Sequence, residues 1–81
     1  MELTDIKATQ RKIDGYYFVR RITFKVDGKP VKVRETLPTY TAERNYEGFE
    51  TPACNIESNG SEYEDWKIKD ELDEWMKWND L

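Results

Sequence analysis

Two Asp-Gly pairs, Asp14-Gly15 and Asp27-Gly28, lie between segments in which apolar and polar residues alternate. Asp-Gly is the strongest short-range signal for a β-hairpin, because both residues tolerate the positive φ angles that a tight turn requires. Alternation at every second residue is typical of strands that bury only one face. The first half of the chain is therefore predicted to form an antiparallel meander of three strands.

The second Asp-Gly pair fixes the pairing of the two strands that flank it. A two-residue loop at Asp27-Gly28 brings apolar residues opposite one another on one face and sets Arg20 opposite Glu35 there. Such pairs contribute roughly 0.2–1 kcal/mol each. On the other face Arg21 falls opposite Arg34, and like charges so placed are destabilising. The apolar pairs are Phe24 with Val31, Ile22 with Val33, and Phe18 with Leu37.

The first Asp-Gly pair allows two loop lengths. A two-residue loop would place Ile6 and Ala8 on the polar face. A three-residue loop, Asp14-Gly15-Tyr16, instead places them beside Phe24 and Ile22, so the hydrophobic pattern favours the longer loop. The expected strands are Leu3–Ile13, Tyr17–Val26 and Val31–Leu37, with Pro30 at the start of an edge strand, where its missing N–H costs little.

The second half of the chain is expected to contain the C-terminal helix. Thr41–Tyr46 fits a short helix, and Phe49–Ser58 fits a loop or a short extra strand around Ala53–Ile56. Ser61 and Glu64 have the spacing of a capping box, in which each side chain satisfies a free backbone donor of the other residue. Helix would then run from Glu62 to Asn79, with one apolar stripe formed by Ile68, Leu72, Trp75 and Met76.

A competing interpretation makes Tyr63–Lys69 a strand, because residues 66–69 alternate, and begins the helix near Asp70. Both versions give the same class. The expected fold is α+β, a single domain in which a three-stranded antiparallel β-meander, with or without a short fourth strand, packs against one C-terminal α-helix.

Charge is sorted along the chain, which carries a net charge of −4. Residues 1–40 hold nine Lys or Arg against five acids, whereas residues 57–81 hold nine acids against three lysines. Two candidate binding surfaces follow. The outer sheet face would present Tyr17, Arg21, Lys25, Lys32 and Arg34, and the helix would present Tyr63, Trp66, Asp70, Asp73 and Glu74.

Each surface has an ordinary structural explanation beside the functional one. The cations suit a solvated face that discourages aggregation, and they also suit a platform for phosphates or acidic side chains, with Tyr17 available for stacking. Trp66 would either pack on the 39–52 loop or remain exposed among carboxylates. In the second case it is a hot-spot candidate, because Trp is enriched at binding hot spots.

Several classes of chemistry lack their usual residues in this chain. It has no histidine, which removes the commonest general base and metal ligand. Its single cysteine, Cys54, cannot form an internal disulfide and has no neighbouring cation in the sequence to stabilise a thiolate. We expect no enzymatic activity, no metal and no cofactor. No apolar run is long enough to span a membrane and the N-terminus has no signal-peptide pattern, so cytoplasmic location is expected.

The basic meander over Arg11–Leu37, with its alternation and Asp-Gly turns, resembles the arm-binding or AP2-like modules at the start of some phage integrases. Those modules lay their sheet on DNA, so the resemblance implies nucleic-acid binding by the outer sheet face. An acidic whole-chain pI near 4.8 weighs against that function unless the helix lies on the far side of the sheet.

The favoured hypothesis is a small protein-binding module encoded by a phage or mobile element. It would act as an inhibitor or adaptor, of the anti-CRISPR or host-takeover type, that docks on a nucleic-acid-handling protein through its charged surfaces. The alternative is the nucleic-acid-binding module just described. In either case the unprotected edge strand at Leu3–Ile13 is a place where a second copy could pair.

Overall fold

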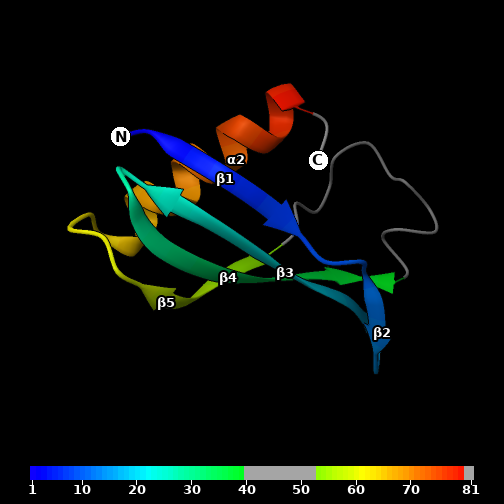
Figure 1. Ribbon diagram of the computed structural model, residues 1–81. Helices are drawn as coiled ribbons and strands as arrows, with labels where there is room; N and C mark the ends of the chain where they lie inside the picture. The colour runs from blue at the N-terminus through cyan, green and yellow to red at the C-terminus, as the bar shows by residue number, and fades with distance from the viewer. Residues whose placement is uncertain (40–52, 80–81) are drawn as a thin grey trace.

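The computed structural model describes residues 1–39 and 53–79. The described strands form one antiparallel sheet in the order β1-β3-β4-β5, with the short β2 also paired to β3 (Figure 1). One helix, α2, covers one face of this sheet, so the α+β prediction, with its fourth strand, is confirmed. The elements are β1 Leu3–Ala8, β2 Lys12–Asp14, β3 Tyr17–Val26, β4 Lys29–Pro38, β5 Ala53–Asn59 and α2 Asp65–Asn79.

The hairpin of β3 and β4 has the predicted register throughout. Arg20 pairs with Glu35, Arg21 pairs with Arg34, and the three predicted apolar pairs are also formed. Asp27 and Gly28 have φ angles of 49° and 83°. Two positive φ angles in succession are the requirement of a type I′ turn, whose twist matches that of the strands it joins.

The predicted strand Leu3–Ile13 is wrong as a single element, because it is divided into β1 and β2. The three-residue loop is also wrong: Asp14 pairs directly with Tyr17, which leaves Gly15 and Tyr16 as a two-residue turn. Gly15 supplies the positive φ, 63°, that this turn needs. The one-residue offset is absorbed between the two strands, where the Thr9 hydroxyl accepts a hydrogen bond from the Arg21 N–H at 3.0 Å.

In β1, on the N-terminal side of that break, Ile6 and Ala8 lie on the apolar face of the sheet as predicted. Ala8 pairs with Ile22 as expected. Ile6 has no partner in register on β3, because the pairing shifts between Thr4 and Lys7, yet its side chain still packs against the core. Asp5 lies in this bulge with a φ of 54°.

Pro30 does not start an edge strand, because β4 is flanked by β3 and β5. Its carbonyl accepts a hydrogen bond from the Gly60 N–H at 2.8 Å, just past the end of β5. A Cβ on Gly60 would lie 2.8 Å from the same carbonyl oxygen, so this position requires glycine. The missing Pro30 N–H therefore costs little because the neighbouring strand ends there.

Helix α2 begins three residues later than the capping-box spacing predicted, and the alternative strand at Tyr63–Lys69 is also wrong. The first intrahelical bonds run to the carbonyl of Glu64. Asn59 organises the approach instead: its Oδ1 accepts from the N–H and hydroxyl of Ser61, and its Nδ2 donates to the Tyr63 carbonyl. The predicted helix at Thr41–Tyr46 lies outside the described residues.

The core lies between the inner sheet face and α2. Ile68 and Leu72 are fully buried against sheet residues from β3 and β4. Each such side chain contributes roughly 1.5–3 kcal/mol by burial. No described helix or strand covers the opposite face of the sheet, where many of the charged side chains lie. The sheet residues of the core are Ile22, Phe24, Val26, Val31 and Val33.

Candidate functional site

The outer sheet face carries the predicted cations on the side opposite α2. Arg21 and Lys25 alternate with the buried residues of β3, and Lys32 and Arg34 do the same in β4. Two further lysines, Lys7 and Lys12, lie on the same face and were not predicted from the sequence. Their positions opposite Thr23 and Val19 could have been found only with the correct register of β1 and β2. We call the basic face the set Lys7, Lys12, Tyr17, Arg21, Lys25, Lys32 and Arg34.

Acidic residues neutralise part of the basic face. Arg21 donates to Glu57 at 2.9 Å, which is a tight hydrogen-bonded pair. Lys25 lies 3.5 Å from Asp5, and Arg34 lies 3.6 Å from Asp14. Because Arg21 and Arg34 each have their own acidic partner, their placement opposite one another is tolerated. Lys7 and Lys32 form no ion pair with any described residue.

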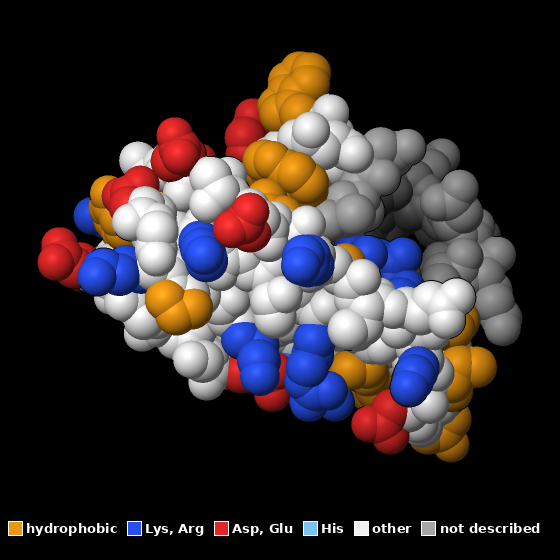
Figure 2. All heavy atoms as spheres, in the orientation of Figure 1, with side chains coloured by type: hydrophobic (Ala, Val, Ile, Leu, Met, Phe, Trp, Pro, Cys, Tyr) orange, Lys and Arg blue, Asp and Glu red, His pale blue; other side chains and the backbone are white. Residues whose placement is uncertain are grey.

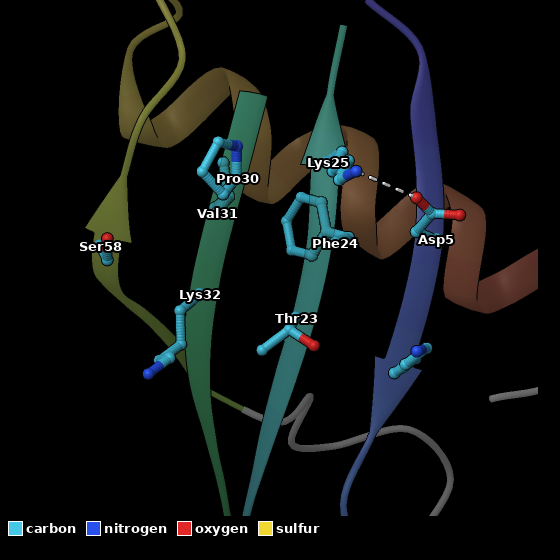
Figure 3. Close-up of a pocket in the computed structure, with 9 residues that line it drawn as sticks. Asp5, Thr23, Phe24, Lys25, Pro30, Val31, Lys32 and Ser58 are labelled. Carbon is cyan, nitrogen blue, oxygen red and sulfur yellow. Dashed lines mark ion pairs between the residues drawn. The ribbon is translucent and has the colours of Figure 1, made fainter. Parts of the chain in front are cut away.

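Two shallow depressions mark the ends of the basic face. One, of about 510 Å³, is lined by Lys7, Lys25 and Lys32 together with Thr23 and Ser58. Figure 3 shows Thr23, Lys25 and Lys32 on the near side of the sheet, with α2 behind it and Lys25 directed at Asp5. The other depression, of about 640 Å³, lies beside Tyr16, Tyr17 and Arg34.

The β2–β3 hairpin projects from one end of the sheet (Figure 1). Its large apolar side chains are exposed to solvent: Tyr16 is 83% exposed, Ile13 70% and Tyr17 48%. In the view of Figure 2, hydrophobic side chains gather over this hairpin at the lower right, while Lys and Arg side chains are spread over the middle of the sheet. Aromatic rings and cations therefore share one side of the molecule.

The helix carries most of the second predicted surface. Trp66, Asp70, Asp73 and Glu74 all lie on α2 and are exposed, and we call them the acidic face. Trp66 is 57% exposed, so its indole is not part of the hydrophobic core. Its Nε1 donates to the Glu64 carboxylate, and Lys67 Nζ lies 5.5 Å from the ring centre.

Tyr63 does not belong to the helix as predicted, because α2 begins at Asp65. Its hydroxyl donates a hydrogen bond of 2.6 Å to Asp27 in the β3–β4 turn. That bond lowers the pKa of Asp27 and raises the pKa of Tyr63, since it favours the ionised carboxylate and the protonated phenol. The Glu2 N–H, which also donates to Asp27, lowers the pKa of that carboxyl further.

A second group of polar side chains lies beneath the C-terminal half of α2. Glu35 is 1% exposed, and its carboxylate accepts from Arg20 at 2.8 and 3.1 Å and from Arg11 at 3.0 Å. Burial raises the pKa of Asp73, and so do its neighbours Asp70 and Glu35.

Cys54 lies close to the same group. Burial, followed by the charges of Glu35 and Asp73, raises the pKa of its thiol to about 11. A thiol with such a pKa is almost wholly protonated near neutrality and is a poor nucleophile. Among residues 1–39 and 53–79, no three acidic or cysteine side chains are grouped as metal ligands.

The edge strands bear on the predicted pairing of two copies. β1 is one edge of the sheet, and its bulge at Asp5 and the Lys25–Asp5 pair are devices that discourage strand addition. Pairing through this edge stays a prediction. The two charged faces lie on opposite sides of the sheet.

Within the described part of the chain, no helix is long and apolar enough to cross a membrane. The sheet keeps the predicted three-stranded meander and adds β5 to it. The chain matches no protein-family model, no curated protein and no solved structure.

Proposed function

We propose that this protein is a non-enzymatic protein-binding module that acts in the cytoplasm as an inhibitor or adaptor. Its partner would be a protein that handles nucleic acid, and the docking surface would be the acidic face of α2. The observation that carries the proposal is the exposed indole of Trp66 among the carboxylates of the helix. A free cysteine, Cys54, suits a reducing compartment.

An exposed tryptophan flanked by acids combines two features of a binding surface. Trp66 offers a large ring that loses little conformational freedom on docking, and Trp is enriched among residues that dominate interface energies. Asp70 follows four residues later on the same side of the helix. Carboxylates in this position complement a cationic groove such as one that ordinarily receives phosphates.

Trp66→Ala combined with Asp70→Lys is the variant that tests this proposal. Asp70 is preferable to Asp73 because Asp73 lies near the buried Glu35, and a change there would disturb the core. Tagged wild type should recover one partner from a lysate of the source cell, identified by mass spectrometry as a nucleic-acid-handling protein. With that partner purified, the variant should bind at least roughly 30-fold more weakly, as expected for a hot spot.

Trp78→Ala provides the matched control. Trp78 is also an exposed indole of α2, at 74%, and its Nε1 also donates to a carboxylate, that of Glu74. It lies about 120° around the helix from Trp66, so its removal should leave the partner bound. Equal affinity of wild type and the Trp66→Ala, Asp70→Lys variant would remove the acidic face from the function.

A further inference from the structure

We infer that the basic face, on the side of the sheet that the proposed docking surface does not use, is a binding site for single-stranded nucleic acid. Two observations combine in this inference: an open row of cations and exposed tyrosine rings at one end of it. The inference is independent of the proposed function, because the acidic face lies on the far side of the sheet.

The cations provide a track for phosphates along the strands. Lys7, Lys25 and Lys32 line the depression at one end, and Arg34 lines the depression at the other. Tyr17 and Lys25 are eight residues apart on β3, which is roughly 26 Å at the rise of a strand. That length provides room for several nucleotides, in line with site sizes of about 4–16 nucleotides in other sheet-based binders.

The acids on this face do not prevent phosphate binding. Asp5 and Asp14 are exposed, and they lie at 3.5 and 3.6 Å from Lys25 and Arg34. Exposed pairs of this kind contribute roughly 0–1 kcal/mol, so a phosphate can replace the carboxylate. Lys32 has no ion-pair partner among the described residues. Only Arg21 is held tightly, by Glu57 at 2.9 Å.

The tyrosines favour a single strand over a duplex. Tyr16 and Tyr17 are 83% and 48% exposed, and both line the depression that also contains Arg34. A ring next to a cation can stack on a base whose phosphate the cation holds. Bases in a duplex are already stacked on one another, so their faces are not available to these rings. Acidic peptides would match the cations but would make no use of the ring faces.

Fluorescence anisotropy with a labelled oligo-dT of about 12 nucleotides tests the inference. Wild type should bind, and its affinity should fall as salt rises from about 50 to 200 mM. Lys32→Glu with Arg34→Glu should weaken binding at least tenfold and reduce the salt dependence, because phosphate contacts are lost. Tyr17→Ala should weaken binding roughly 5- to 150-fold while leaving the salt dependence unchanged, because stacking releases no counterions.

Lys67→Glu with Lys77→Glu is the control, since it makes the same change of net charge on α2 and should leave oligonucleotide affinity at the wild-type value. Circular dichroism of each variant confirms that the sheet is intact. The inference fails if wild type shows no salt-sensitive binding, or if a duplex of equal length binds as well and Tyr17→Ala has no effect. It also fails if light scattering shows that Lys32 and Arg34 instead hold a second copy of the chain.

Discussion

Glu35 is the most deeply buried charged residue among those that the structure describes. Its side chain is 2% exposed and receives hydrogen bonds from Arg11 and Arg20. Among the described residues, no buried side-chain nitrogen or oxygen lacks a hydrogen-bond partner. Removal of one member of a buried charged group is costly, because charges that remain have already lost their hydration.

Glu35→Gln is therefore expected to lower the free energy of unfolding by about 3–5 kcal/mol. The substitution preserves the shape of the side chain but sets two guanidinium groups against a neutral amide. Urea denaturation followed by tryptophan fluorescence measures the change. Glu57→Gln, in the exposed pair with Arg21, is the control and should cost no more than about 1 kcal/mol. Equal losses in the two variants would contradict the prediction.

The sequence predicted only part of the buried group formed by Glu35, Arg20 and Arg11. The pairing of Arg20 with Glu35 follows from the register set by Asp27-Gly28, and the structure confirms it. Arg11 was not predicted to join it, because its position depends on the break between β1 and β2. Local alternation cannot reveal that break: the offset becomes visible only when Asp14 is seen to pair with Tyr17.

At the scale of elements, one hydrogen bond joins the β3–β4 turn to the segment that leads into α2. Tyr63 donates to Asp27 at 2.6 Å. The capping-box spacing misplaced Tyr63 on the helix, because Asn59 takes the hydroxyl of Ser61 for its own turn. The existence of α2 and its apolar stripe were nevertheless predictable, since periodicity depends on many residues and a cap on only a few.

The Tyr63–Asp27 bond predicts a defined dependence of stability on pH. The pKa of Asp27 lies below its ordinary value of 3.8, so its contribution is present above that pH and is lost as pH falls through the lowered pKa. The pKa of Tyr63 lies above 10.0, so its contribution is present below that pH and is lost as pH rises through the raised pKa. The bond therefore stabilises the fold between these limits.

Tyr63→Phe should lower the free energy of unfolding at neutral pH, and the difference from wild type should shrink in strong acid and strong base. In NMR titrations the pKa of Asp27 should rise in this variant but stay below its ordinary value, because the Glu2 N–H still donates to it. Tyr16→Phe is the control, since the Tyr16 hydroxyl makes no hydrogen bond with any described residue. An unchanged Asp27 titration in Tyr63→Phe would disprove the assignment.

At the scale of the whole molecule, the uneven charge along the sequence becomes a separation in space. The sheet alternation sends cations to one side, and the apolar stripe of α2 sends most of its carboxylates to the other. Ile68 and Leu72 hold the helix on the inner face, so among the described elements none covers the basic face. The net charge of −4 therefore does not indicate the sign of the charge on either face.

This separation predicts that the two binding events are independent. Trp66→Ala should leave the affinity for oligo-dT at the wild-type value, and Lys32→Glu should leave the affinity for the protein partner unchanged. Substitutions more than about 7–10 Å apart with no shared contacts act additively, and here a strand layer and the core separate the two side chains. The double variant should then lose both activities by the amounts that the single variants lose separately. Anisotropy and calorimetry on the same four proteins measure this, and a variant that weakens both ligands would show that the two faces act as one surface.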